Sequence, residues 1–280
     1  MKVGVIIPVV QREMYNQLMA SISTNTLRPN HIVTIDNSEH GISQVCIPGI
    51  QQTVIRNKPQ KDAEGNFMPG NGTNEAWKQG MEVLGQTVDI ITFLNDDVIL
   101  NPLFFEKTYH TMEDCPKCGF LVPSPNGDLE LVKRYNRRNE PDKIHKTKER
   151  HGWAMTLRRS LLDKFPPIPN GMTIWYGDNW FADLTNMFGY YRLIRRDNPV
   201  FHYGGTSSKQ EIERASQPVM SRKRRNEHDV FLRAIREYKQ NKAEEELQNE
   251  LKKLDARPKK PISEGTEQSD RKDESAEDQK

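Results

Sequence analysis

The stretch Ile90-Ile91-Thr92-Phe93-Leu94-Asn95-Asp96-Asp97-Val98 is an apolar run that ends in two adjacent carboxylates. Five apolar or β-branched residues bounded by polar ones predict a buried strand, which places Asp96 and Asp97 at the edge of a sheet. Neighbouring carboxylates repel each other and resist desolvation, so such a pair faces either water or a cation. Taken alone, the pair is better explained as a solvated cap before the next helix, but the rest of the chain favours the cation.

The bulk composition describes a folded protein with a polar portion. The chain has 280 residues, 35% of them hydrophobic, and a mean hydropathy of −0.82, which indicates a globular part diluted by a polar segment. With 41 basic and 39 acidic residues, the net charge of +2 does not by itself imply a polyanionic partner. No run approaches the ~18 apolar residues that span a bilayer, and no signal-like segment follows Met1, so we expect a cytoplasmic protein.

The cysteines do not indicate a disulfide framework, because there are three of them in a long chain. Cys115 and Cys118 have the spacing of half a zinc site, but no second pair stands at the spacing of a zinc finger. We therefore interpret them as surface or core thiols.

The start of the chain predicts a β-α-β unit. Residues 3–7 form a short apolar run closed by Pro8, a helical pattern follows over residues 14–22, and a second strand is expected at residues 31–35. A helix between two strands makes them parallel, and ligands of such sheets lie beyond the carboxyl ends of the strands. The polar or turn residues at those ends are Pro8, Asp36, Asp96 and Asp97.

The middle of the chain continues this alternation without a known phosphate-binding loop. There is no GxGxxG after the first strand and no GxxxxGK[ST], so a Rossmann oxidoreductase and a nucleoside triphosphatase have no support. The further elements that we expect are strands at 52–56, 120–122, 153–157, 191–196 and 199–202, and helices near 74–84, from Asn101-Pro102, at 158–165 and from Asn179 towards Gly189.

Two basic segments stand out. The connection from Lys133 to His151 is most simply a solvated loop, and the alternative is that it selects an anionic acceptor or a diphosphate. Together with Arg222-Lys223-Arg224-Arg225, it makes DNA or another polyanion a hypothesis that salt dependence would test.

The composition changes from Arg222 onward. Phe231, Ile235 and Tyr238 keep a helical stripe, whereas the last twenty or so residues carry too little apolar surface to fold. We predict a domain over residues 1–220, a charged helical extension over 221–257 that is exposed or binds a partner, and a disordered tail over 258–280.

Seven motifs in this order resemble glycosyltransferase family 2, over roughly residues 1–208. They are Val5-Ile6-Ile7-Pro8-Val9-Val10, Ile35-Asp36-Asn37-Ser38, Asn71-Gly72-Thr73-Asn74-Glu75-Ala76, Phe93-Leu94-Asn95-Asp96-Asp97-Val98, Gly152-Trp153-Ala154-Met155, Tyr176-Gly177-Asp178 and Phe201-His202-Tyr203-Gly204-Gly205. The resemblance implies a single α/β domain of GT-A type, with a mainly parallel central sheet flanked by helices. A C-terminal helix and a disordered tail would follow it.

The resemblance also implies an activity. A member of this family moves a hexosyl or pentosyl group from a nucleoside-diphosphate sugar to an acceptor hydroxyl, with inversion and with Mn²⁺ or Mg²⁺. By position, Asp97 and His202 would bind the metal and Asp178 would be the general base. His202 is otherwise a structural histidine, Asp178 an N-cap, and Asp183 an alternative base.

Substrate contacts are implied in the same way. The residues that would bind the nucleotide sugar are Pro8, Val9, Val10, Asp36, Asn71, Asn74, Asn95 and Asp96. Those that would stack on an acceptor are Trp153, Trp175 and Tyr176, which could equally be core aromatics. The sequence departs from the family where Asn95 and Gly177 replace acidic residues, which weakens the ribose contact but leaves Asp97 and Asp178 in place.

Two other functions stay open: a non-catalytic protein that binds a nucleotide sugar, and a nucleotidyltransferase on a related sheet. The intact carboxylates argue against the first, and the lack of a Gly-rich basic loop after Pro8 argues against the second. The acceptor could be a glycan, a lipid-linked sugar, a protein or a modified base in DNA.

Overall fold

The structure is a computed structural model that describes residues 1–61, 67–68, 72–134, 144–204 and 217–255. By internal contacts the chain divides into two units, Met1–Ile235 and Arg236–Lys280, and the first contains the sheet. The predicted boundary at residue 220 falls inside the C-terminal helix, and the tail predicted from residue 258 lies outside the described residues. No described helix is long and apolar enough to cross a membrane.

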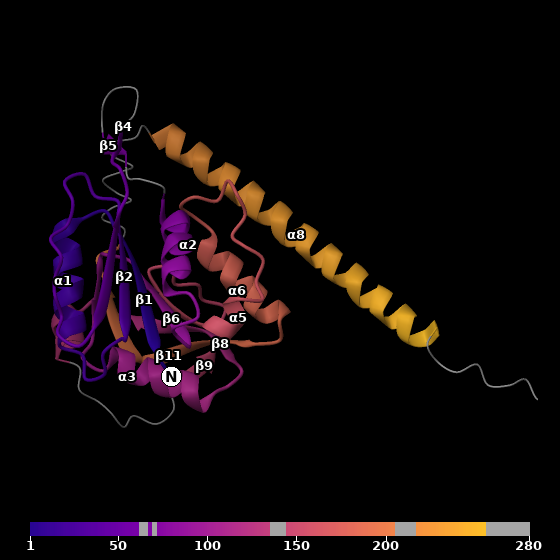
Figure 1. The fold of residues 1–280 in the computed structure, drawn as a ribbon, viewed down its shortest axis with the longest axis horizontal. Coiled ribbons are helices and arrows are strands. Elements are labelled where there is room, and N and C mark those ends of the chain that lie inside the picture. Colours follow the sequence, from indigo (N-terminus) through magenta and orange to yellow (C-terminus); the bar gives the residue numbers. More distant parts are fainter. Residues whose placement is uncertain (62–66, 69–71, 135–143, 205–216, 256–280) are drawn as a thin grey trace, which may run out of the picture. The chain divides into compact units, whose positions relative to one another are not determined.

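Strands and helices alternate through most of the first unit (Figure 1). The strands are β1 (Val3–Val9), β2 (His31–Asp36), β3 (Gln51–Arg56), β4 (Gln60–Lys61), β5 (Phe67–Met68), β6 (Ile90–Leu94), β7 (Val98–Leu100), β8 (Cys118–Pro125), β9 (Ile144–Lys146), β10 (Ala154–Arg158) and β11 (Tyr191–His202). The helices are α1 (Arg12–Ser23), α2 (Thr73–Leu84), α3 (Phe104–Asp114), α4 (Leu129–Lys133), α5 (Arg159–Leu162), α6 (Gly177–Met187) and α8 (Gln217–Asp255).

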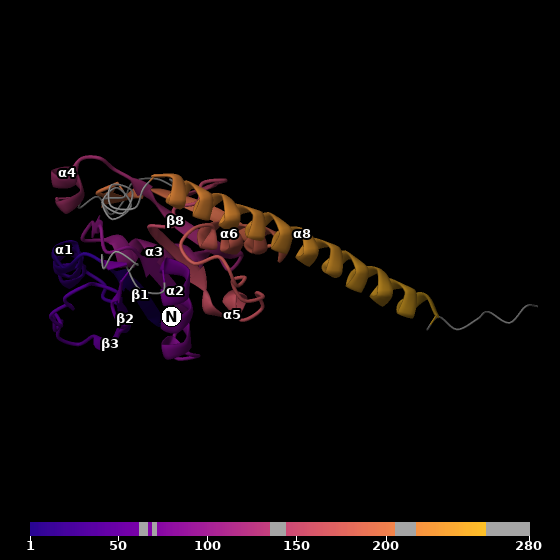
Figure 2. The ribbon, with the colours of Figure 1, turned by 90° about the horizontal axis from the view of Figure 1, so that it is seen from above.

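One nine-stranded sheet organises the described part of the first unit, in the order β3-β2-β1-β6-β10-β8-β11-β7 with β9 beside β11. Parallel pairing joins β3, β2, β1 and β6 and also joins β11 to β8, whereas β10, β7 and β9 pair antiparallel. Figure 2 shows β1, β2 and β3 following one another towards the edge. This agrees with the predicted α/β fold on a mainly parallel sheet flanked by helices.

The two faces of β1 bury against different helices, because successive side chains of a strand point to opposite sides. Val5 and Ile7 belong to the core cluster that includes α1 and α3. Gly4 and Ile6 face α2, where Gly80 and Leu84 approach them so closely that added side-chain atoms would collide. Both faces are therefore covered, which explains why the first strand is apolar throughout.

On the α2 side, three aromatic rings join the sheet to two helices. Trp77 of α2 lies edge-on to Phe93 of β6 at 5.3 Å and stacks on Phe181 of α6 at 6.1 Å. Phe93 and Phe181 are 5.6 Å apart. Such pairs add to the free energy of burial, so they fix α6 against the strand that precedes Asp96 and Asp97.

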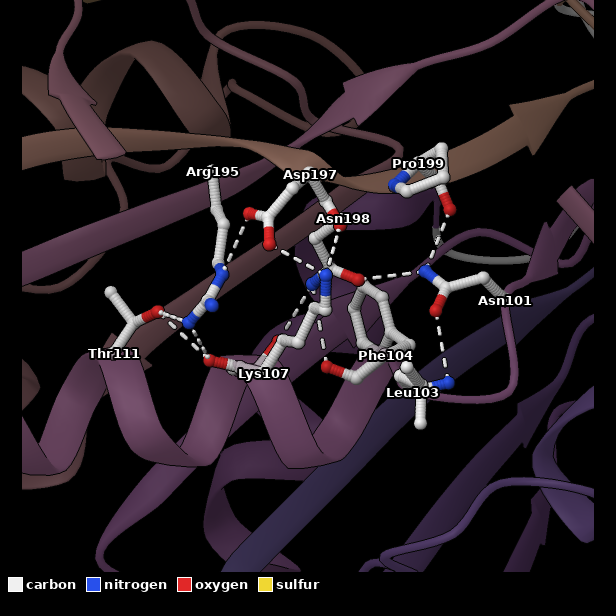
Figure 3. Close-up of polar contacts among 10 residues, drawn as sticks. Asn101, Leu103, Phe104, Lys107, Thr111, Arg195, Asp197, Asn198 and Pro199 are labelled. Carbon is white, nitrogen blue, oxygen red and sulfur yellow. Dashed lines mark hydrogen bonds and ion pairs between the residues drawn. The ribbon is translucent and has the colours of Figure 1, made fainter. Parts of the chain in front are cut away.

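A buried polar network joins α3 to a bulge in β11 (Figure 3). The Lys107 ammonium donates to the carboxylate and the carbonyl of Asp197, both at 2.6 Å, and Arg195 donates to the other carboxylate oxygen. Burial alone raises the pKa of Asp197, but the bonds from Lys107 and Arg195 outweigh it and hold that pKa below its usual value. The charges are thus paired and hydrogen-bonded, as a buried ion pair requires.

The same network holds β7. Asn101, directly after β7, donates to Asn198 Oδ1 at 2.7 Å and to the Pro199 carbonyl at 2.8 Å. Asn198 in turn donates to the Phe104 carbonyl at the start of α3. The end of β7 is therefore tied to β11 next to the bulge.

Several expected elements differ in extent. The strand expected from the five residues at 90–94 is confirmed as β6, but the strand β7, which begins at Val98 after a turn that holds Asp96 and Asp97, was not expected. The two strands expected at 191–202 form one strand, since the bulge at 195–199 bends β11 without ending it. The helix expected from Pro102 begins at Phe104, because residues 101–103 form a turn.

Replacing Lys107 by Met is expected to destabilise the protein by about 3 kcal/mol, because the buried Asp197 would lose the cation at its Oδ2 and keep only Arg195 at its Oδ1. Urea unfolding of Lys107→Met measures this, with Lys117→Met as the control because Lys117 is exposed. Equal midpoints for the two variants would show that the ion pair does not hold α3 to β11.

Candidate active site

Asp96 holds the loop after β1. Its Oδ2 accepts the backbone N–H groups of Val10 at 2.8 Å and Gln11 at 2.7 Å. Burial raises the pKa of Asp96 to about 7, with those two bonds acting in the opposite direction. The structure thus brings together the predicted donor-binding residues Val10 and Asp96, with Asp96 shaping the loop around Val10. Its predicted contact to the donor stays a prediction.

The Asp36 carboxylate also accepts hydrogen bonds from other groups of the protein. Its Oδ1 accepts from the backbone and hydroxyl of Ser38, and its Oδ2 accepts from Ile42 N at 3.1 Å and Arg56 Nη1 at 2.9 Å. Four donors use the acceptor positions of a carboxylate. Asp36 therefore shapes the loop after β2, and reading a nucleotide base would require it to release one partner.

Asp97 and His202 face each other across two elements. Antiparallel pairing of β7 with β11 places His202 opposite Val98, and Asp97 Oδ1 lies 3.4 Å from His202 Nε2. Both atoms are buried, and neither has a hydrogen-bond partner among the described residues. Unsatisfied buried acceptors are costly, and a carboxylate oxygen with an imidazole nitrogen at this separation fits two adjacent ligands of one Mn²⁺ or Mg²⁺.

No described cluster contains three or more His, Cys, Asp or Glu side chains in an arrangement that would hold a metal. As far as the described side chains go, a metal at Asp97 and His202 would therefore need further ligands, which a bound substrate or water could supply. That requirement suits a site in which a diphosphate completes the coordination shell.

The Trp153 ring packs between two histidines, one of which is His202. Its ring stacks on His202 at 5.0 Å and on His151 at 4.9 Å, both at an interplanar angle of 17°. His151 is anchored to the Pro123 carbonyl and to Glu149. The stacking on His202 fixes one face of that imidazole, and the predicted role of Trp153 in binding the acceptor stays a prediction.

Asp178 lies in the first turn of α6, beside the chain that leads into β10. Its Oδ1 accepts the N–H group of Asn179 at 2.9 Å, and the Gly152 backbone and the Arg150 cation are close enough to influence its pKa. Burial is the largest influence and raises the pKa of Asp178, while Arg150 and the two amides act to lower it. A raised pKa makes a carboxylate a stronger base than an ordinary aspartate.

The segment at residues 150–153 connects Asp178 to the pair formed by Asp97 and His202. Gly152 contacts Asp178 so closely that an added Cβ would lie 3.0 Å from the carboxylate, and Trp153 is next in the chain. Trp153 also accepts the backbone N–H of Asn95 at 2.9 Å through its carbonyl. The predicted residues Asn95, Trp153 and Asp178 are therefore brought together by residues 150–153, among which only Trp153 was predicted to be a site residue.

Asn74 is placed differently from its prediction. Its side chain is fully buried, and its amide group donates to the carbonyls of Met172 at 3.1 Å and Trp175 at 3.0 Å. It therefore holds the loop before α6. The alternative that it caps α2 is wrong, because Gly72 is the N-cap residue, whereas its predicted contact to the donor stays a prediction. The other asparagine predicted to bind the donor, Asn71, lies outside the described residues.

The remaining predicted residues have these surroundings. Pro8 and Val9 are buried at the end of β1. Tyr176 packs on Phe231 and His228 of α8. Asp183, the alternative base, is paired with Arg150 at 2.7 Å. Glu227 of α8, which no sequence motif indicated, accepts hydrogen bonds from the loop that contains Trp175.

Replacing Gly177 by Ala is expected to destabilise the protein by about 1–3 kcal/mol, because a Cβ there would lie 2.1 Å from Asn74 Oδ1 and 2.7 Å from the Trp77 ring. The better helix propensity of Ala, about 1 kcal/mol, is too small to offset this overlap.

Urea unfolding tests this against Gly127→Ala, since nothing lies within 4 Å of a Cβ at Gly127. A Gly177→Ala variant as stable as wild type would contradict the tight packing of α6 on α2.

Comparison with known proteins identifies the fold. No family model matches the chain, and no curated protein matches its sequence. The structure is similar to the crystal structure of GalNAc-T7 with UDP, GalNAc and Mn²⁺, with a TM-score of 0.54 and 14% identity over 72% of this chain and 43% of that chain. It is also similar to S. aureus TarS 1–349, with a TM-score of 0.49 and 13% identity over 72% of this chain and 60% of that chain.

The chain thus spans less than two thirds of the length of either structure. At these identities the likeness concerns the arrangement of the backbone, and it agrees with the mixed sheet and its flanking helices. The chain has a GT-A-like fold.

Proposed function

We propose that the protein is a metal-dependent, inverting glycosyltransferase that moves a sugar from a nucleoside-diphosphate sugar to an acceptor hydroxyl. The observation that carries the proposal is the buried pair of Asp97 Oδ1 and His202 Nε2, which lacks hydrogen-bond partners among the described residues and is joined through residues 152 and 153 to Asp178. The similar GalNAc-T7 structure, with UDP, GalNAc and Mn²⁺, supports a divalent cation and a nucleotide-sugar donor.

The residues of the site divide the chemistry between them. A divalent cation held by Asp97 and His202 would supply positive charge beside the departing diphosphate. Asp96 fixes the loop at Val10, which forms one wall for the donor. Asp178 takes the proton of the acceptor hydroxyl, and the hydroxyl oxygen then attacks the anomeric carbon from the side opposite to the diphosphate. One displacement of this kind inverts the configuration at that carbon.

The first test measures release of nucleoside diphosphate from a panel of nucleotide sugars with Mn²⁺, with glycan, lipid-linked sugar and DNA acceptors as separate arms. Asp178→Asn is expected to lower kcat about 10²–10⁴-fold, the usual contribution of a general base, and to leave donor binding intact. Asp183→Asn is the control, because Asp183 is already paired with Arg150. Transfer by Asp178→Asn at the wild-type rate would overturn the assignment of the base.

The pH dependence of kcat should reflect the raised pKa of Asp178. Because the base must be deprotonated, activity falls as the pH drops through this pKa, at a higher pH than for an ordinary aspartate of pKa about 4. Arg150 acts to lower this pKa, so Arg150→Gln should move the acid limb to still higher pH.

Arg134→Gln is the matched control, since Arg134 is exposed and paired with Glu130. An acid limb that stays in place in Arg150→Gln, or moves to lower pH, would show that the titrating group is not Asp178.

A further inference from the structure

Glu227 is a buried carboxylate on a helix that no motif connects to the site. Its side chain is 2% exposed. Oε1 accepts the Thr173 hydroxyl at 2.8 Å, and Oε2 accepts the backbone N–H groups of Ile174 at 3.1 Å and Trp175 at 2.8 Å. Three consecutive residues of one loop thus donate to a single carboxylate.

Packing of α8 alone does not explain why a glutamate stands at position 227. Phe231 and Ile235 follow it at intervals of four residues and are buried. An apolar side chain at 227 would continue this stripe without burying a charge. A buried carboxylate is stable only when donors surround it, and among the described residues every hydrogen-bond donor to Glu227 comes from the loop at 173–175.

The opposite side of the loop is held by α2. Asn74 donates to the carbonyls of Met172 and Trp175. Trp175 therefore has its N–H bound to Glu227 and its carbonyl bound to Asn74. The backbone of the loop is fixed from two helices that are far apart in the sequence.

The loop ends in a strained residue immediately before the proposed base. Tyr176 has a φ of 65°, and no other non-glycine residue of the described chain has a positive φ. Such a conformation costs on the order of 1–3 kcal/mol and persists only where the surroundings impose it. The Tyr176 ring stacks on Phe231 at 5.7 Å, and after Gly177 the chain reaches Asp178.

We propose that Glu227 is a positioning residue for the base: its carboxylate sets the loop at 173–176 and thereby the place of Asp178 at the start of α6. This inference rests on the proposed function, because it assigns a role in the same site. It makes the first part of α8, up to Ile235, a component of the active site.

The experiment compares kcat, donor KM and the acid limb of the pH profile for full-length variants. Glu227→Ala removes all three acceptor bonds and should lower kcat about tenfold or more, with donor KM changed less than about twofold, because displacing a catalytic group by about 1 Å can cost 10²-fold. Its acid limb should move to lower pH, because a looser loop admits water to Asp178, whose pKa is raised mainly by burial against the lowering effect of Arg150.

Glu227→Gln should restore kcat to within about threefold of wild type, because its amide oxygen can accept the two N–H groups while its NH₂ donates to the Thr173 hydroxyl. Glu237→Ala is the matched control, the same change at an exposed position of α8. If Glu227→Ala does not fold, Thr173→Val carries the test, with a smaller loss of kcat at unchanged donor KM.

The outcomes separate this inference from the proposed function. An inactive Asp178→Asn together with unchanged kcat in Glu227→Ala, or in Thr173→Val where it stands in, overturns the positioning role and leaves the base in place. Equal losses in Glu227→Gln and Glu227→Ala also overturn it. Full activity of Asp178→Asn would instead refute the proposed function itself.

Discussion

The antiparallel pairing of β7 with β11 is the constraint on which the candidate site depends. It places His202, the last residue of β11, opposite Val98. His202 thereby lies next to Asp97, which is more than a hundred positions earlier in the chain. The buried bonds of Asn101 and the Lys107–Asp197 pair hold β7 and the β11 bulge in that register (Figure 3). A slip of one residue would turn the His202 side chain to the other face of the sheet.

The part of the candidate site around Asp178 is formed by the segment at 150–153 and helix α6. The segment at 150–153 contacts the base through Gly152 and the histidine through Trp153. Helix α6 carries Asp178 and is fixed by the ring contacts of Phe181 with Trp77 and Phe93. Asp97 follows β6 in the chain, and α6 packs on Phe93 of β6, so both halves of the candidate site are joined to that strand.

Local sequence patterns predicted most strands and several site residues, but they missed the interactions between residues that are distant in the sequence. Apolar runs indicated most strands, and the carboxylates at strand ends gave Asp36, Asp96 and Asp97, because both signals lie within a few residues. Sequence patterns could not show that Asp96 would bond to the loop after β1 or that Asp36 would bond to Arg56 of β3, since these partners are distant in the sequence. Glu227 left one weak signal, a charge on the apolar stripe that continues at Phe231, and its partners lie more than fifty residues away.

The central claim is that Asp97 and His202 bind one divalent cation together with the donor diphosphate. Pulsed electron paramagnetic resonance of Mn²⁺ bound in the presence of UDP measures this directly, because a coordinated imidazole nitrogen couples to the electron spin. The account predicts coupling to one histidine nitrogen that disappears in His202→Gln. Bound Mn²⁺ without nitrogen coupling in the wild type, or coupling that persists in His202→Gln, would contradict it.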